Sequence, residues 1–380
     1  MVGEPEVVGC VKLRSGPTVL STSRPLGPSR VIASNCVVPV EVGSTPGATA
    51  DLLSVEPDHG VAPLGLPALR HLAAARLAHI GLAATADEVF VTAGAHHGLR
   101  TAFELLANPN SPVVVEEYTY GAVVDLARRF GANLIGLARR RDGVDPDELR
   151  AVIARTRPAF VLLATSIHSP TGCTTDPQRL LEIAAVLNRS AVPAVIDETY
   201  AELHYETRPA PLASYLTSPN LTIESVSKTA WAGLRTGWIR ASAGLRPALA
   251  AAFETDLGQP VPSQLLTCRL LSNDYEGFLA TRRVELDAKA QALRRLAVEF
   301  VPDWEVVTPD GGLTHWIDTG KADATEVTTQ ARRSVVLIAP GTAFQHRRTT
   351  SSFVRICHDR PEQLVATALE RIAATDANRH

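Results

Sequence analysis

The sequence predicts an α/β fold: a three-layer sandwich with a mainly parallel central sheet, plus a smaller α+β domain. Between residues 88 and 227, short and nearly continuous apolar runs alternate with amphipathic helical segments. This alternation is typical of parallel strands that are covered by helices on both faces. The chain has 380 residues, more than a single hydrophobic core usually organises, so we expect two domains.

Composition divides the chain into three regions. Residues 1–50 are rich in Pro, Gly, Ser and Val without a helical period, and they predict an extended N-terminal arm. Residues 51–284 carry the alternating strands and helices and form the predicted large domain. Residues 285–380 change to a helix followed by short strand-like runs, so they form the predicted small domain. A ligand would then lie between the domains, near the carboxyl ends of the large-domain strands.

The elements follow in a readable order. A first helix is expected in LPALRHLAAARLAHIG, whose apolar residues recur at three-and-four spacing up to Gly81. Strand-like runs and helices then alternate: EVFVTAGA, HHGLRTAFELLA, SPVVVEEYTY, GAVVDLARRFG, ANLIGLA, DPDELRAVIARTR, PAFVLLATS, DPQRLLEIAAVLNRS, AVPAVIDE and NLTIESVS. Two helical stretches come next, LRPALAAAFETDLG and YEGFLATRRVELDAKAQALRRLAVEF. The tail predicts a small sheet from WEVVTPDGGLTHWID, VVLIAPGTAF and SFVRICHD, closed by the helix PEQLVATALERIAA.

Charge and cysteine usage favour small-molecule chemistry. The formal net charge is −3 and no run of five or six like charges occurs, which leaves no basic surface for nucleic acid or an anionic membrane. The five cysteines are scattered without metal-ligand spacing, so we expect neither a disulfide framework nor a metal site. The N-terminus lacks the pattern of a secretory leader and no apolar run is long enough to cross a membrane, so we expect a cytoplasmic protein.

Polar or aromatic residues occur where several predicted strands end. TAGAHHG (92–98) has the small residues that let a helix start approach an anion, although a plain strand-to-helix turn would look the same. Tyr118 and Tyr120 end the next strand and offer a ring for stacking, with core packing as the alternative. In IDETY, an apolar strand delivers Asp197, with Tyr200 three residues later. Such a carboxylate needs a cationic partner, so a buried salt bridge or a helix cap is the alternative.

The stretch SVSKTAWAGLRTGW (225–238) combines an amine with donors for a phosphate. Burial and neighbouring cations lower the pKa of a lysine, which makes Lys228 available for Schiff-base formation. Ser225, Ser227 and Arg235 are suitable partners for a phosphate dianion, because hydroxyls donate and arginine offers a bidentate fork. Pyridoxal 5'-phosphate is the cofactor that requires a lysine, an acid for its ring nitrogen, a stacking aromatic and a phosphate cup together.

From about residue 60 to its end, the chain resembles fold-type I pyridoxal-phosphate enzymes of the class I/II aminotransferase family. The ordered set of motifs carries the resemblance, because any one of them is a frequent chance match. The resemblance implies that Lys228 forms the Schiff base and that Asp197 and Tyr200 bind the ring nitrogen and ring hydroxyl. The remaining implied cofactor contacts are stacking by Tyr120 and phosphate binding by Gly94, Ala95, His96, Ser225, Ser227 and Arg235. Arg355 in SFVRICHD matches the arginine that binds the substrate carboxylate; a surface or interdomain arginine is the alternative.

The chain departs from the family pattern at several positions. SIHSPTG (166–172) places Ser169 where relatives have an asparagine that bonds the ring hydroxyl, and Ser169 is shorter. His168 beside it is either a substrate or cofactor contact or a turn-stabilising residue. Gly60 stands where many relatives have a tyrosine, and Tyr118 replaces a common proline. The interval from Lys228 to Arg235 is similar to that of aminoadipate-type aminotransferases and of the aminotransferase-like domain of MocR-type regulators.

The resemblance implies a transferase of amino acid metabolism that moves an amino group from an L-α-amino acid to a 2-oxo acid through Lys228. A β- or γ-lyase, a decarboxylase or a cyclase would use the same site, and the missing asparagine and tyrosine motivate that alternative. A noncatalytic sensor is a third hypothesis, against which the first 50 residues show no pattern of a winged helix. The family also implies a homodimer. The arm is then a candidate for contacts with the partner subunit or for covering the substrate, with an unstructured tail over its first dozen residues as the alternative.

Overall fold

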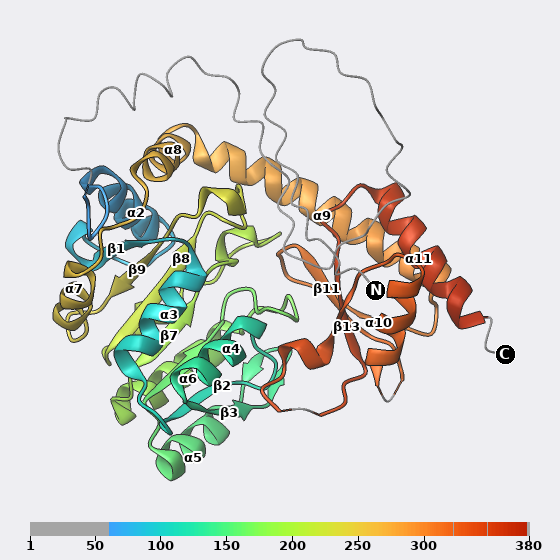
Figure 1. Ribbon diagram of the computed structural model, residues 1–380, viewed down its shortest axis with the longest axis horizontal. Helices are drawn as coiled ribbons and strands as arrows, with labels where there is room; N and C mark the ends of the chain where they lie inside the picture. Colours follow the sequence, from blue (N-terminus) through green and yellow to red (C-terminus); the bar gives the residue numbers. More distant parts are fainter. Residues whose placement is uncertain (1–60, 322, 348, 378–380) are drawn as a thin grey trace, which may run out of the picture.

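The structure is a computed structural model that describes residues 61–321, 323–347 and 349–377. These residues build two main sheets that lie side by side, with helices packed around each, and a separate two-stranded hairpin (Figure 1). The predicted arm at residues 1–50 and Gly60 lie outside the described residues.

The larger sheet has seven strands in the order β1-β9-β8-β7-β6-β2-β3. Strand β2 is parallel to β3 and β6, and the parallel pairing continues from β6 to β7 and from β7 to β8. Strand β9 runs antiparallel to both of its neighbours, which are β8 and β1. The predicted mainly parallel sheet is therefore confirmed. The strands are β1 (Val89–Thr92), β2 (Pro112–Glu116), β3 (Asn133–Leu137), β6 (Phe160–Leu163), β7 (Ala194–Asp197), β8 (Asn220–Ser225) and β9 (Gly237–Ala241).

Helices cover both faces of this sheet, which explains why its strands are apolar throughout. Val113 and Val115 of β2 share a core with residues of α3, α4 and α7, whereas Val114 shares one with α5 and α6. The pleat sends alternate side chains to opposite faces, so each face needs its own apolar residues. The helices are α3 (Ala95–Leu106), α4 (Gly121–Phe130), α5 (Pro146–Thr156), α6 (Pro177–Ser190) and α7 (Arg246–Glu254), with α2 (Pro67–His79) and α8 (Val261–Ser272) beside β1 and β9.

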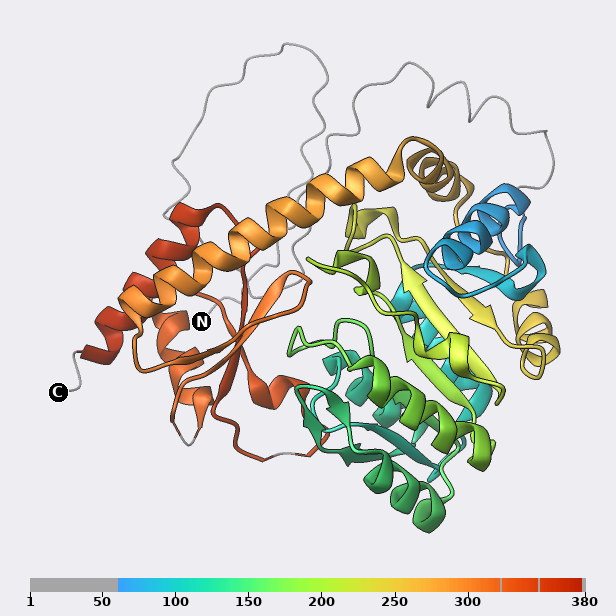
Figure 2. The same ribbon diagram turned by 180° about the vertical axis from the view of Figure 1, so that it is seen from behind.

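The smaller sheet is antiparallel, in the order β10-β11-β13-β12, and it packs against α9, α10 and α11. Helix α9 (Tyr275–Phe300) runs from the side of the large sheet to the small one (Figure 2). The other elements are β10 (Glu305–Val307), β11 (Thr314–Asp318), β12 (Ala339–Pro340), β13 (Phe353–Cys357), α10 (Ala324–Arg333) and α11 (Glu362–Ala377). The hairpin β4 (Arg139–Arg140) and β5 (Gly143–Val144) and the 3-10 turns η1 (Ala86–Glu88), η2 (Ala201–Leu203), η3 (Leu212–Tyr215), η4 (Ala232–Leu234) and η5 (Gly341–Phe344) complete the fold.

Several elements were not predicted as such, among them α8, the β4–β5 hairpin, α10 and β9. Helix α10 contains threonines and charged residues, which gives a weak sequence signal, and it is held by packing of Ala324, Val327 and Ala331 in the small-domain core. Strand β9 begins at Gly237, inside the stretch 225–238 that we expected to bind a phosphate, and continues to Ala241. The predicted domain boundary between residues 284 and 285 falls within α9 and stays a prediction. Among the described residues, no helix is both long and apolar enough to cross a membrane.

Candidate active site

A cavity lies at the carboxyl ends of β1, β2, β6, β7 and β8, and most of the predicted site residues line it. Ala232 of η4 and Thr199 and Tyr200, in the turn after β7, also line this cavity. The lining residues are Gly94, Ala95, His96, Leu99, Tyr120, Ser169, Asp197, Thr199, Tyr200, Ser227, Lys228, Ala232 and Arg235. Parallel strands bring their carboxyl ends to one edge of the sheet, so residues more than a hundred positions apart meet there.

One end of the cavity is suited to an anion. Gly94 caps the start of α3 with φ 91°, a left-handed conformation that favours glycine. A Cβ on Gly94 would lie 3.6 Å from Ser225 Oγ and 3.9 Å from Arg235 Cζ, so both side chains face this helix start. The first N–H groups of a helix have no partner within it, and here they are those of Ala95 and His96. Backbone, hydroxyl and guanidinium donors therefore converge on one point.

The serines of this end are held by hydrogen bonds. Ser225 Oγ donates to Thr236 O (2.9 Å), lies 2.9 Å from Ser227 Oγ, and accepts from Ser227 N (3.2 Å). Gly237 at the start of β9 lets the strands approach, because a Cβ there would lie 2.5 Å from Glu224 O and 3.0 Å from Gly94 Cα. The close backbone contact of Gly237 with Glu224 and Gly94 thus helps to fix the positions of Ser225 and of the α3 start.

Lys228 lies deep in the cavity, with 8% of its surface exposed. Burial and the nearby Arg355 guanidinium lower the pKa of Lys228 to about 7, although Asp197 acts in the opposite direction. Its Nζ lies 5.3 Å from the centre of the Tyr200 ring. A large fraction of the amine is therefore neutral near pH 7 and able to act as a nucleophile, as the sequence predicted.

Asp197 ends β7 and faces the same cavity. Thr199 donates its backbone N–H (3.0 Å) and its hydroxyl to Asp197 Oδ1, which fixes the carboxyl group. Burial raises the pKa of Asp197, while the hydrogen bonds from Thr199 and the charge of Lys228 lower it. A ligand cation placed against this carboxyl group would favour its ionised form.

The two tyrosines of the cavity are neutral phenols at ordinary pH. Burial raises the pKa of Tyr200 to about 12 and also raises that of Tyr120. Tyr120 caps the start of α4, which fixes its backbone at the end of the β2 loop. Both therefore present aromatic surface and a hydroxyl hydrogen to the cavity.

Arg355 reaches the cavity from the small sheet. It lies in β13 and is buried, and its guanidinium is 4.4 Å from the centre of the Phe344 ring. Its Nη1 donates to the Oγ of Ser169, one of the lining residues, at 3.4 Å. The structure thus places Arg355 between the sheets and beside the cavity, and not on the surface.

His168 lies behind the cavity and does not line it. Its side chain is 1% exposed, and burial lowers its pKa well below the usual range, so the ring is neutral. One ring nitrogen lies 2.9 Å from Tyr118 O and the other 2.9 Å from Thr171 Oγ1. Both nitrogens are thereby engaged, and the geometry favours the turn-stabilising role over a substrate contact.

The turn that carries Ser169 is supported by a buried ion pair. Arg139 donates to Glu116 Oε1 (2.8 Å) and to Cys173 O (3.0 Å), and Glu116 Oε2 accepts from the Ala164 backbone (2.9 Å). Burial raises the pKa of Glu116 to about 7 despite the neighbouring guanidinium. These contacts join the ends of β2 and β6, from which Tyr120 and Ser169 extend.

Sequence reasoning missed Thr199, Leu99, Ala232 and Phe344. Thr199 had a usable signal, because a threonine two residues after an aspartate often closes a side-chain turn. Leu99 and Ala232 are apolar lining residues with no distinguishing pattern. Phe344 contacts Arg355 only because η5 and β13 pack together in the small domain.

The residues of the cavity fit pyridoxal 5'-phosphate, the cofactor that the resemblance implies. The helix start at Gly94 with Ser225 and Arg235 offers an anion cradle, which is what a phosphate requires. Lys228 supplies a largely neutral amine, and Asp197 an anchored carboxyl group for a ring nitrogen. The shorter Ser169 accepts a hydrogen bond from Arg355 and still lines the cavity.

Comparisons with known proteins identify the family of the chain. The family model described as "Aminotransferase class I and II" matches residues 47–372. The uncharacterized HTH-type transcriptional regulator YdcR of Escherichia coli is 26% identical over 299 residues, which are 77% of this chain and 64% of the regulator. The 2-aminoadipate transaminase of Thermus thermophilus is 28% identical over 267 residues, covering 68% of this chain and 67% of that protein.

Solved structures show the same fold. The α-aminoadipate aminotransferase LysN from Thermus thermophilus, complexed with N-(5'-phosphopyridoxyl)-L-leucine, superposes with a TM-score of 0.81 at 23% identity and covers 87% of each chain. The aspartate aminotransferase of Thermus thermophilus with maleate gives a TM-score of 0.78 at 22% identity, covering 86% of each chain.

Proposed function

Because the chain belongs to the class I and II aminotransferase family, we propose that it is a pyridoxal-phosphate-dependent aminotransferase. It would move an amino group from an L-α-amino acid to a 2-oxo acid. The chain spans 64% of the Escherichia coli regulator that it also resembles, so family membership alone does not distinguish an enzyme from a sensor. One observation carries the proposal: Lys228, with its pKa lowered to about 7, shares one cavity with an anion cradle and the anchored Asp197.

Pyridoxal 5'-phosphate is the cofactor of this family, and four sets of residues would hold it here. The α3 start, Ser225, Ser227 and Arg235 would bind its phosphate, and Asp197 its ring nitrogen. Tyr120 would lie against its ring, and Tyr200 would donate to its ring hydroxyl. When bound, this cofactor stabilises the electron pair that remains after the α-proton leaves the substrate.

The remaining chemistry belongs to side chains of this protein. Arg355 would bind the substrate carboxylate, which orients the Cα–H bond toward the interior of the cavity. Lys228 would then accept the proton from Cα and hold it inside the cavity. A pKa of about 7 suits this exchange, because an acid–base group works best when its pKa lies near the operating pH. Burial of Lys228 and Arg355 keeps water away from the reacting atoms.

Amino-group exchange is the direct test of this function. The purified protein, supplied with pyridoxal phosphate, is expected to show a visible absorption band that L-amino acids remove, with one 2-oxo acid formed per amino acid consumed. Adding a different 2-oxo acid should restore the band. A product other than a 2-oxo acid, formed while the band persists, would indicate a lyase, decarboxylase or cyclase instead. Capture of the cofactor without turnover of any amino acid would indicate a sensor.

The lowered pKa of Lys228 predicts how cofactor capture depends on pH. The neutral amine attacks the aldehyde, and its fraction increases as pH rises through the pKa of about 7. The rate of band formation in the cofactor-free protein should therefore rise with a midpoint near pH 7, measured by stopped-flow absorbance. A midpoint near the ordinary value for lysine, about 10.4, would contradict the burial argument.

The oligomeric state, the location and the domain organisation are also proposals. We propose that the protein is a homodimer, as the family resemblance implies. We also propose a cytoplasmic location, which is supported by the free cysteines among the described residues, since thiols stay reduced in that compartment. The large domain at 51–284 and the small domain at 285–380 complete the proposed organisation.

A further inference from the structure

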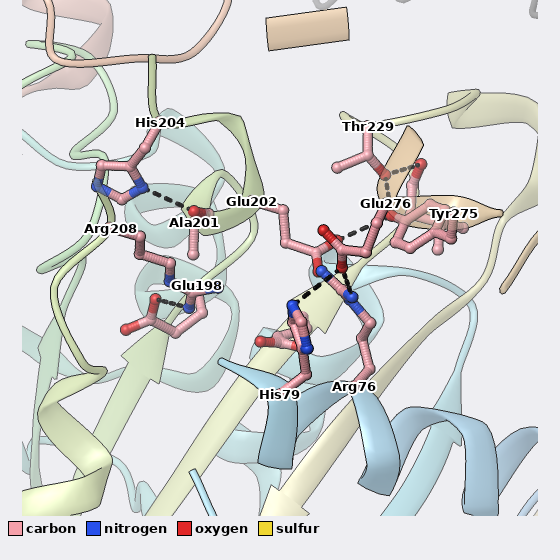
Figure 3. Close-up of polar contacts among 12 residues, drawn as sticks. Arg76, His79, Glu198, Ala201, Glu202, His204, Arg208, Thr229, Tyr275 and Glu276 are labelled. Atoms are coloured by element: carbon pink, nitrogen blue, oxygen red, sulfur yellow. Dashed lines mark hydrogen bonds and ion pairs between the residues drawn. The ribbon is translucent and has the colours of Figure 1, made fainter. Parts of the chain in front are cut away.

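A polar network connects Thr229, the residue after Lys228, with Tyr275 and Glu202 (Figure 3). Thr229, which follows Lys228, has its Oγ1 2.9 Å from the Tyr275 hydroxyl. The Tyr275 hydroxyl also lies 2.8 Å from Glu202 Oε2, to which it donates. Thr229 and Tyr275 are 2% and 4% exposed, so water cannot replace these contacts. The two hydrogen bonds therefore join three segments of the chain through one phenol.

Arg76 of α2 fixes the position of Tyr275. Its Nε donates to Glu202 Oε1 and its Nη1 to Glu276 Oε1, while its guanidinium lies 5.0 Å from the centre of the Tyr275 ring. His79 lies 3.2 Å from the same Glu276 oxygen. Figure 3 shows these side chains converging from the end of α2 and the start of α9. The phenol is thus held from both its ring face and its hydroxyl.

Glu202 connects the network to the other side of the cavity. It lies in η2, the turn that begins directly after Tyr200, and its backbone oxygen accepts from Arg283 Nε (2.8 Å). The turn is closed by the Leu203 N–H, which donates to Tyr200 O (2.9 Å). Tyr200 in turn faces Lys228, whose Nζ lies 5.3 Å from its ring centre. The segments that carry Lys228 and Tyr200 are consequently linked in two ways. The Lys228 amine lies near the Tyr200 ring, and Tyr275 connects Thr229 with Glu202.

We propose that Tyr275 is a positioning residue, whose hydroxyl ties the Thr229 segment to the Glu202 turn and so sets where the Lys228 amine stands. This inference rests on the proposed function of Lys228. The physical reason is that an amine transferring a proton must be placed accurately, and a misplacement of about 1 Å costs about a hundredfold in rate. None of Tyr275, Thr229 and Glu202 lines the cavity, so they act through Lys228 and Tyr200.

The test removes each end of one hydrogen bond. Tyr275→Phe and Thr229→Val each delete a hydroxyl with little change of shape, whereas Thr229→Ser keeps the hydroxyl and loses only a methyl group. Cofactor capture by the cofactor-free protein, followed in the visible band, is expected to slow about tenfold in the first two variants and less than about threefold in Thr229→Ser. In the loaded protein, kcat should fall by a similar factor while KM for the amino acid stays within about threefold.

The double variant shows whether the two hydroxyls act as one unit. Tyr275→Phe combined with Thr229→Val should be no slower than Tyr275→Phe alone, because Tyr275→Phe already removes the hydrogen bond to Thr229. Tyr215→Phe provides a matched control, since Tyr215 lies on η3 with 37% of its surface exposed. Circular dichroism and the thermal unfolding midpoint show which variants are folded.

The outcomes separate the two claims. Capture and turnover unchanged in Tyr275→Phe and Thr229→Val, with normal capture in the unmodified protein, would overturn only the positioning role. Effects that multiply in the double variant would also overturn it, because the hydroxyls would then act separately. If the unmodified protein captures no pyridoxal phosphate at all, the proposed function fails and the positioning role fails with it.

Discussion

Replacement of Lys228 with alanine is expected to abolish amino-group exchange and the visible band of bound pyridoxal phosphate together. Lys228 is the amine that lies inside the cavity, so its removal takes away both the covalent attachment and the acid–base group. General acid–base catalysis alone contributes about 10²- to 10⁴-fold, so we expect kcat to fall by at least about 10³-fold. Exchange is measured as 2-oxo acid formed, and attachment by absorbance.

Two variants separate the chemistry of Lys228 from its charge and from folding. Lys228→Arg keeps a cation but offers no comparable amine, and it should be as inactive as Lys228→Ala. Lys321→Ala removes a lysine outside the cavity and should retain both activity and band. Burial disfavours the charged form of Lys228, so Lys228→Ala should not lower the unfolding midpoint. Substantial exchange in Lys228→Ala would contradict the assignment of this residue.

Lys228 also carries a pH dependence of stability with a definite sign. Its pKa is about 7 in the folded protein and near the ordinary value of 10.5 when unfolded, so the unfolded chain binds more protons between these values. The contribution of Lys228 to the free energy of unfolding therefore increases as pH rises from about 7 toward 10.5. Lys228→Ala should remove this part of the slope.

The second large effect is expected from Asp197→Asn. The amide can still accept the hydrogen bonds that Thr199 donates to Oδ1, so the turn should remain closed. The variant loses the negative charge that is proposed to face the ring nitrogen. We expect the visible band to remain, because Lys228 is intact, while kcat falls by about 10²- to 10³-fold, the range seen when one electrostatic contact to a developing charge is removed.

A neighbouring residue supplies the matched control for Asp197. Glu198 is also buried, but it points away from the cavity, where it contacts Ser166 and accepts from Arg208 (3.2 Å, Figure 3). Glu198→Gln makes the same chemical change one position later and should affect stability more than kcat. Single-turnover kinetics with one amino acid measures the chemical step directly. Equal losses of kcat in both variants would argue against a specific role for Asp197.

The order of strand-end motifs was enough to predict where the site lies. Tyr120, Asp197 and Lys228 each follow or end an apolar strand, and parallel pairing brings these strand ends together. Gly94 joins them because β1 and β8 both pair antiparallel with β9 and therefore run in the same direction. The same reasoning could not decide the orientation of His168. Whether that ring enters the cavity or turns back to Tyr118 O depends on packing against the β2 loop, which the local sequence does not encode.

Arg355 illustrates the opposite case. Its motif predicted a carboxylate-binding arginine, but a surface position was also compatible with the sequence. The pairing of β13 with β11 and the contact with Phe344 place its guanidinium beside the cavity. Likewise, α10 has only three apolar residues among threonines and charged residues, and these three side chains pack in the small-domain core.

The sequence by itself determined most of the elements and their order, the mainly parallel sheet, and the residue types that the chemistry needs at the strand ends. These features depend on local periodicity and on turn residues, which are written along the chain. The tertiary structure alone decided that Lys228 has a pKa of about 7, that His168 lies behind the cavity, and that Tyr275 links the segments of Lys228 and Tyr200. Burial and hydrogen bonding between distant residues depend on how elements pack in space, and spacing along the chain does not fix that packing.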